Sequence, residues 1–174
     1  MIKSAIRTIV DYPKPGIHFR DITTLVANPE AFSEVMRQLT ERYIDNNIRW
    51  VAGIEARGFI FGAALANNIG AGFLPIRKAG KLPAETIRES YSLEYGEDEL
   101  EIHTNTINKG DTVLIVDDLI ATGGTAEAAI KLVRRAGGHI LECCFVINLP
   151  DLGGAERVSE LDCGCFSLCE FEGG

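Results

Sequence analysis

The residues best able to do chemistry lie between positions 117 and 125, where two acids precede a turn of small and hydroxyl-bearing residues. The turn reads Ala121-Thr122-Gly123-Gly124-Thr125. Its two glycines lack a Cβ and can adopt positive φ, which lets several backbone N–H groups approach one anion. The threonine hydroxyls add donors, and a helix beginning after the turn would aim the positive end of its dipole at the same point. The pattern predicts a cradle for a phosphate monoester.

The two acids, Asp117 and Asp118, would repel a phosphate held in that cradle, so we expect them to serve a group beside it. Ribose hydroxyls or a magnesium ion suit paired carboxylates at a strand end. The combined prediction is a ribose 5-phosphate. The stretch matches neither GxxxxGK[ST] nor GxGxxG, which argues against a nucleoside-triphosphatase or a dinucleotide-binding protein. The alternative, a buried strand and turn without a ligand, would leave two costly acids without a partner.

Elements that position these residues can be read from hydrophobic patterns. The apolar run 113–116 predicts a strand buried on both faces of a parallel sheet, and residues 126–137 have helical spacing. Trp50–Ile54 predicts a second buried strand, followed by a loop at 55–58 and a helix over 59–69. Ligands bind beyond the carboxyl ends of the strands in such open sheets, so Arg57 is expected to face the first turn across a second anion site. The alternative is a surface Arg–Glu pair without function.

Other segments complete an α/β fold, with a central, mostly parallel twisted sheet flanked by helices. We expect helices over 2–10 and from Asn28 to about Asp45, and a short helix or turn over 155–160. Further strands are predicted at 72–76, 139–148 and, at an edge, 166–169. The charged, Gly- and Pro-containing segment from 78 to about 89 lacks apolar periodicity and predicts a mobile loop, and a β-hairpin is expected over 91–95 and 100–104.

Composition limits the class of protein. With 174 residues, 46% hydrophobic and 24% charged, the chain predicts a single globular domain over 1–174. Its net charge of −8 argues against nucleic-acid or anionic-membrane partners. No signal peptide or membrane-spanning run is visible, so a cytoplasmic location is expected. The five cysteines are expected to be reduced and structural, because the spacing of a metal knuckle is missing.

Basic residues nevertheless gather in the loops assigned to one edge of the sheet. A polyanionic small ligand explains local positive charge in an acidic protein better than solubility does, although a solvated lid with scattered lysines is the alternative. The residues concerned are Arg57, Arg77, Lys78, Lys81 and Arg88.

Four segments together resemble a known family. Residues 113–125 resemble the phosphoribosyl-diphosphate signature of the type I phosphoribosyltransferases. Three others resemble the adenine phosphoribosyltransferases: Gly16-Ile-His-Phe-Arg-Asp-Ile22, Glu55-Ala-Arg-Gly-Phe59, and Arg77-Lys-Ala-Gly-Lys-Leu-Pro83 with Tyr91-Ser-Leu-Glu-Tyr-Gly96. The resemblance runs from about Tyr12 to about Phe171. It implies the type I fold with a small N-terminal hood, approximately 1–27, and a flexible lid, approximately 78–104.

The resemblance also implies an activity: adenine and phosphoribosyl diphosphate give AMP and pyrophosphate, with Mg²⁺, in a homodimer. Residues 121–125 would hold the 5′-phosphate, while the two acids would hold the ribose hydroxyls and, through these or water, the metal. Phe19 and Arg20 would stack on and orient the base, with Leu119 or Ile120 on its other face.

The remaining roles concern the leaving group and the purine proton. Glu55, Ala56, Arg57 and Gly58 resemble the family's pyrophosphate loop, which carries a cis peptide that we expect between Glu55 and Ala56. Neutralisation of the diphosphate would fall to Arg57, Arg77, Lys78 and Lys81. Glu94 resembles the acid that manages the purine proton, beside Tyr95, and a surface acid of the hairpin is the alternative.

Three rival functions remain at this level, one of which is a bare sugar-phosphate-binding protein that would not need an acid in the lid. A phosphoribosyltransferase for another purine base would share the phosphate signature, but the hood and lid segments favour adenine. A non-catalytic regulator that senses phosphoribosyl diphosphate and binds nucleic acid would need a basic face or an added DNA-binding segment. The acidic net charge argues against that regulator.

Overall fold

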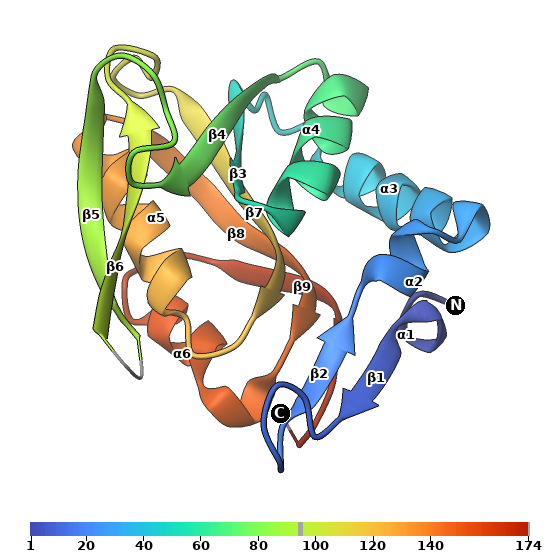
Figure 1. Cartoon of the computed structure of the whole chain (residues 1–174). Coiled ribbons are helices and arrows are strands. Elements are labelled where there is room, and N and C mark those ends of the chain that lie inside the picture. Colours follow the sequence, from blue (N-terminus) through green and yellow to red (C-terminus); the bar gives the residue numbers. More distant parts are fainter. Residues whose placement is uncertain (94–95, 174) are drawn as a thin grey trace.

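A seven-stranded sheet forms the centre of the molecule, which the computed structural model describes for residues 1–93 and 96–173 (Figure 1). Neighbouring strands from β4 to β9 run parallel, whereas β6 runs antiparallel to β4 and β5. The predicted α/β fold with a mostly parallel sheet is therefore confirmed. From edge to edge the strands are β5 (Thr86–Leu93), β6 (Gly96–His103), β4 (Gly72–Lys78), β3 (Trp50–Ile54), β7 (Thr112–Ile120), β8 (His139–Asn148) and β9 (Cys165–Glu170).

Helices cover both faces of this sheet (Figure 1). One face packs against α3 (Pro29–Tyr43) and α4 (Arg57–Ile69), and the other against α5 (Gly124–Arg135) and α6 (Gly154–Ser159), which follows the 3₁₀ turn η1 (Pro150–Leu152). The central strand β7 alternates between the two cores: Leu114 and Val116 join the first, whereas Val113 and Ile115 join the second. A strand covered on both sides needs apolar residues on both, which explains its unbroken apolar run.

The predicted start of α3 is confirmed at atomic detail. The side-chain oxygen of Asn28 accepts hydrogen bonds from the backbone N–H groups of Glu30 and Ala31, both at 3.1 Å. Pro29 occupies the first helical position, where its missing N–H has no intrahelical acceptor to lose.

The N-terminal segment corrects one prediction. A helix was expected over 2–10, but α1 (Ile2–Ala5) ends early and β1 (Arg7–Val10) pairs antiparallel with β2 (His18–Asp21), followed by α2 (Thr23–Val26). The intervening prolines and Gly16 reverse the chain, so backbone pairing overrides the helical spacing of the isoleucines. The two strands form a small sheet separate from the main one. From here on the hood means residues 7–21, the part of the expected 1–27 segment that forms this small sheet.

The segment 78–89, expected to be a loop, lacks regular structure only between β4 and β5, over residues 79–85. β5 begins at Thr86 and pairs with β6 through to Leu93 opposite Gly96, so residues 86–89 are strand rather than loop. Cross-strand pairing accounts for this difference, because the buried apolar residues Leu100 and Ile102 lie on β6, whereas β5 itself is only exposed or half-buried and has little apolar periodicity. β4 likewise continues beyond Ile76 to Lys78, where it pairs with Leu100.

Glu101 ties the 79–85 connection to this hairpin. Its side chain is 1% exposed and accepts hydrogen bonds from the backbone N–H groups of Lys81 and Leu82, at 3.1 and 2.8 Å. Thr86 Oγ1 and Arg88 Nε donate to its second oxygen, each at 3.2 Å. Burial alone would raise its pKa, but backbone hydrogen bonds led by that of Leu82 outweigh burial and lower the pKa.

All five cysteines are free, so the prediction of unpaired thiols is confirmed. The Sγ atoms of Cys143 and Cys163 lie 3.8 Å apart in the core. Within residues 1–93 and 96–173, no three or more His, Cys, Asp or Glu side chains are grouped as a metal site. No helix in the same residues has the length and apolar character needed to cross a membrane.

Glu101→Gln is expected to lower the free energy of unfolding by about 1–3 kcal/mol. The substitution removes the buried negative charge that accepts these hydrogen bonds, and the N–H₂ of the new amide would face backbone N–H donors where an acceptor is needed. Denaturant unfolding measures this change. Glu99→Gln is the matched control two residues away, on a 44%-exposed side chain, and should stay within about 0.5 kcal/mol. Equal effects of the two substitutions would contradict the anchoring role of Glu101.

Candidate active site

The turn between β7 and α5 forms the predicted cradle with one difference in its backbone. Gly123 has φ of +81°, whereas Gly124 is the first residue of α5 with ordinary helical geometry. Only Gly123 therefore needs the positive φ that was expected of both glycines. Thr125 lies in the first helical turn, so its hydroxyl and the unpaired N–H groups of that turn face the same side.

Gly154, the first residue of α6, supports this turn from outside. A Cβ on Gly154 would collide with the carbonyl oxygen of Ala121 and would lie 3.0 Å from the backbone nitrogen of Gly123. The side chain of Arg157 also donates to the carbonyl oxygen of Thr122 at 3.4 Å and pairs with Glu127 at 2.5 Å. The shape of the cradle thus depends on a helix that contributes no residue to its lining.

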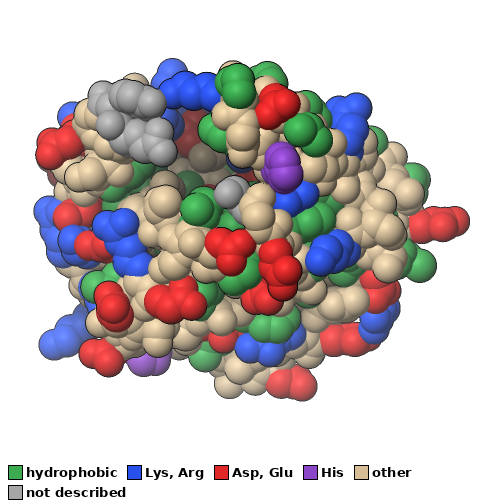
Figure 2. All heavy atoms as spheres, turned by 90° about the horizontal axis from the view of Figure 1, so that it is seen from below, with side chains coloured by type: hydrophobic (Ala, Val, Ile, Leu, Met, Phe, Trp, Pro, Cys, Tyr) green, Lys and Arg blue, Asp and Glu red, His purple; other side chains and the backbone are tan. Residues whose placement is uncertain are grey.

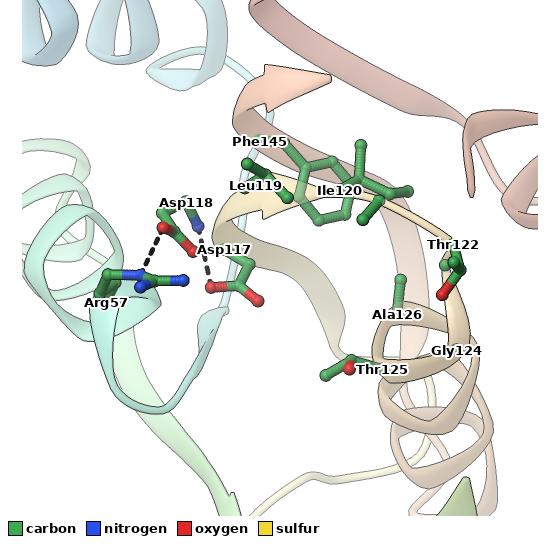
Figure 3. Close-up of a pocket in the computed structure, with 12 residues that line it drawn as sticks. Arg57, Asp117, Asp118, Leu119, Ile120, Thr122, Gly124, Thr125, Ala126 and Phe145 are labelled. Atoms are coloured by element: carbon green, nitrogen blue, oxygen red, sulfur yellow. Dashed lines mark hydrogen bonds and ion pairs between the residues drawn. The ribbon is translucent and has the colours of Figure 1, made fainter. Parts of the chain in front are cut away.

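A cavity of about 220 Å³ opens above the turn (Figure 3). Backbone of the turn lines one side, and two carboxylates and an arginine line the other. The lining residues are Arg57, Asp117, Asp118, Leu119, Ile120, Ala121, Thr122, Gly123, Gly124, Thr125, Ala126 and Phe145. The structure thus brings the predicted cradle and the paired acids to one hollow.

The two carboxylates differ in their surroundings. Asp118 is buried, and its Oδ2 lies 2.6 Å from Arg57 Nε in an ion pair whose angle is poor for a hydrogen bond. Asp117 Oδ1 accepts a hydrogen bond from the backbone N–H of Asp118 at 2.8 Å. Burial, and then the neighbouring Asp118 charge, raise the pKa of Asp117 well above its ordinary value.

A second cavity of about 280 Å³ adjoins the first. Four residues line both: Arg57, Asp117, Asp118 and Thr125. Its other lining residues are Ile54, Glu55, Ala56, Lys78, Tyr91 and Leu100. The peptide between Glu55 and Ala56 is cis, as the resemblance implies. The two cavities form one elongated site with the carboxylates at their junction.

Basic side chains around the second cavity are held by carboxylates. Lys78 Nζ lies 2.5 Å from Asp98 Oδ2, and Tyr91 Oη donates to the same oxygen at 3.2 Å. The hydrogen bond from Lys78 is the largest cause of the lowered pKa of Asp98. Figure 2 shows a hollow in this face of the molecule, with Lys or Arg side chains at its rim and acidic side chains inside.

Arg77 and Lys81 lie outside the lining of both cavities. Arg77 Nη2 reaches Glu55 at 3.4 Å, and its Nη1 donates to the carbonyl oxygen of Lys81 at 3.3 Å. Glu55 also accepts the backbone N–H of Lys78 at 2.6 Å. Helix α4 begins at Arg57, so Arg57 and Gly58 belong to its first turn rather than to the predicted loop. Gly58 packs closely, since a Cβ there would meet the carbonyl oxygen of Val116 at 2.7 Å.

The hood brings one of its two predicted site residues toward the cavities. Phe19 stacks edge-on against Tyr12, with 5.3 Å between ring centroids, and its ring centroid lies 5.8 Å from the Arg57 guanidinium carbon. The Arg20 side chain points elsewhere: its Nη1 donates to Thr8 Oγ1 at 2.7 Å. Successive residues of a strand face opposite sides, so one of the pair turns away. Glu94 and Tyr95 lie outside the described residues.

Several lining residues were missed by sequence reasoning. Phe145 belongs to the predicted apolar strand 139–148, which was given no site role, but it pairs in register with Asp117 on β7 and lines the first cavity. That register becomes visible only once the strand order is known. Asp98 and Tyr91 face Lys78 because β6 folds back beside β5. Tyr91 begins one of the segments that carry the family resemblance, but the resemblance implied no role for it, and its alternation with Leu93 does not distinguish core from site.

Comparison with known proteins identifies the class. A family model described as a phosphoribosyl transferase domain matches residues 21–172. Adenine phosphoribosyltransferase from Photobacterium profundum is 58% identical over 173 residues, covering 99% of this chain and 99% of that protein. The enzyme of the same name from Shewanella woodyi is 57% identical, covering 99% and 96%.

Solved structures of adenine phosphoribosyltransferases share the fold of this chain. Adenine phosphoribosyltransferase from Rhodothermus marinus superimposes with a TM-score of 0.91 at 48% identity, covering 98% of this chain and 96% of that one. The Saccharomyces cerevisiae enzyme, solved in complex with adenine and an imino-altritol bisphosphate, gives 0.89 at 41% identity, covering 97% and 96%. The chain therefore belongs to the phosphoribosyltransferase family and, within it, groups with the adenine phosphoribosyltransferases.

Asp117→Asn is expected to raise the melting temperature at pH 7. The folded-state pKa of Asp117 is raised above the ordinary value of 3.8, so the folded protein loses stability as pH rises from there through the raised value. An amide carries no such penalty. A gain of about 1 kcal/mol corresponds to about 2–4 °C for a domain of this size.

Melting curves from pH 3.5 to 7 check this, with a variant–wild-type difference that grows with pH. Asp118→Asn is the control, since it removes the ion pair with Arg57 and should bring no gain. A pH-independent difference for Asp117→Asn would show that the charge of Asp117 does not destabilise the fold.

Proposed function

We propose that this protein acts in purine salvage by transferring the 5-phosphoribosyl group of phosphoribosyl diphosphate to N9 of adenine, giving AMP and pyrophosphate. The observation that carries this proposal is the elongated site. A backbone cradle suited to a single phosphate lies at one end, a cavity bordered by Lys78 lies at the other, and two carboxylates lie between them. This order matches the 5-phosphate, ribose and diphosphate of the donor.

The charges suit the reaction. Breaking the bond at the anomeric carbon builds positive charge on the sugar and negative charge on the departing pyrophosphate. Arg57 and Lys78 lie where they would stabilise the leaving group, and Asp117 and Asp118 would hold the ribose hydroxyls beside the cationic carbon. Arg77 and Lys81 would act from the edge of the second cavity. The N–H groups and hydroxyls of residues 121–125 would retain the 5-phosphate throughout.

The base would lie between the hood and the end of β7. Phe19 supplies an aromatic face near Arg57, and the partly exposed Leu119 supplies the opposite wall, with Ile120 buried beside it. Because the Arg20 side chain is engaged elsewhere, its backbone groups remain to orient the base. Glu94, with Tyr95 beside it, is proposed to handle the proton of the purine when the hairpin covers the site.

We propose Mg²⁺ as the metal. Asp117 and Asp118 offer carboxylate oxygens, and the described residues hold no larger group of ligating side chains. This donor set fits an ion held mainly by substrate oxygens and water, as Mg²⁺ commonly is. When bound, the ion would neutralise charge on the diphosphate.

A base-competition assay tests the function. Purified protein with phosphoribosyl diphosphate, Mg²⁺ and equal amounts of adenine, guanine and hypoxanthine should form AMP in preference to GMP or IMP, measured by chromatography. Chelation with EDTA should stop the reaction, and added Mg²⁺ should restore it. Preference for another base would refute the choice of adenine, and the absence of any nucleotide product would refute the transferase activity.

A homodimer and a cytoplasmic location complete the proposal. The homodimer is proposed from the resemblance to the adenine phosphoribosyltransferases. The five free thiols support a reducing compartment. Sedimentation equilibrium should give twice the chain mass of 18.9 kDa, and a monomer mass at micromolar concentration would contradict the dimer.

A further inference from the structure

The Arg20 side chain joins the hood to the end of the chain. Its Nη2 donates to the carbonyl oxygen of Glu172 at 3.1 Å, while its Nη1 donates to Thr8 Oγ1 on β1. The guanidinium carbon also lies 4.5 Å from the centroid of the Phe171 ring, within cation–π range. Figure 1 places the C-terminal end beside β1 and β2. We call residues 171–173 the C-terminal strap.

The strap is anchored separately to the main sheet. The backbone N–H of Phe171 donates to the carbonyl oxygen of Asn148 at 3.1 Å, and that of Gly173 donates to Asp151 Oδ2 at 2.7 Å. Asn148 is the last residue of β8, and its side-chain N–H₂ donates to Glu170 at 2.9 Å. The strap therefore bridges two bodies that share no β-ladder, the hood and the main sheet.

The anchor point also belongs to the wall of the site. Asn148 pairs in register with Ile120, and the backbone N–H of Leu149 donates to the carbonyl oxygen of Ile120 at 3.0 Å. One short path of contacts thus runs from the wall of the first cavity through the strap to Arg20. Phe19, the preceding residue, is the aromatic group of the hood that faces Arg57.

We infer that the C-terminal strap positions the hood over the base-binding half of the site, with Phe171 and Arg20 as positioning residues. This inference rests on the proposed function for the identity of the base. The Arg20 guanidinium, stacked on Phe171, fixes the distance between β2 and the end of β7. It thereby sets the gap between Phe19 and Leu119. Loosening the strap should weaken binding of the base without altering the phosphate cradle, whose turn is supported by α6 instead.

Steady-state kinetics of Phe171→Ala and Arg20→Lys test the inference. Each loses one or two of the strap contacts, so the KM for adenine should rise roughly three- to tenfold. The KM for phosphoribosyl diphosphate should stay unchanged. Phe171→Tyr keeps the ring and should restore the adenine KM to the wild-type value.

The chain offers a matched control in a second arginine–phenylalanine stack. Arg42 lies 3.8 Å from the centroid of Phe166, on the part of β9 remote from the hood. Phe166→Ala removes a ring of the same kind and should leave the adenine KM unchanged even where it lowers the melting temperature. A rise in adenine KM equal to that of Phe171→Ala would overturn the inference.

Amide hydrogen exchange supplies a readout independent of turnover. In Phe171→Ala, the N–H groups of Arg7–Val10 and His18–Asp21 should exchange faster, while those of β7 should not. Unchanged exchange in the hood, an unchanged adenine KM, or an equal rise in the KM values of both substrates would each overturn the positioning role. Wild-type protein that forms no AMP would refute the proposed function instead, and hood exchange would still decide the role of the strap.

Discussion

Repulsion between two adjacent carboxylates at the end of β7 is the constraint on which the site depends. Asp118 is balanced by Arg57 at 2.6 Å, whereas Asp117 carries a raised pKa because burial and its neighbour both disfavour its charge. A ligand that donates hydroxyl hydrogens to Asp117 would relieve this cost. Part of the selectivity for a ligand with two neighbouring hydroxyls would therefore arise from relief of the unfavourable charge of Asp117, which is present in the folded protein before the ligand binds.

Carboxylates also order the basic groups before any ligand arrives. Arg57, Lys78 and Arg77 are held by Asp118, Asp98 and Glu55 respectively. Long cationic side chains lose considerable rotamer freedom on binding, and prior pairing removes part of that loss in advance. A diphosphate bound as proposed would compete with these carboxylates for the same cations, and the negative charge that it adds would fall to the proposed Mg²⁺ to offset. Such preorganisation suits a reaction in which negative charge moves onto the leaving group.

Sequence patterns correctly predicted the elements that depend mainly on their own residues. Trp50–Ile54 and His139–Asn148 have the predicted bounds, because buried parallel strands require continuous apolar runs. The helix predicted over 2–10 was wrong from Ile6 onward, since the strand that follows forms only when its partner is present. Phe145 and Tyr91 line the cavities through strand register and hairpin pairing, which no single segment encodes.

The contact between Gly154 and the cradle has a consequence for how substitutions would be interpreted. Even a methyl group at this position would displace the carbonyl oxygen of Ala121, although Gly154 itself lies outside the lining of the cavity. A scan of single substitutions scored by activity would therefore rank Gly154 among the most sensitive positions, beside residues that touch the ligand. Sensitivity at Gly154 would then reflect the close packing that shapes the cradle rather than contact with the ligand. Tolerance of substitutions elsewhere on α6 would separate this effect from a general loss of folding.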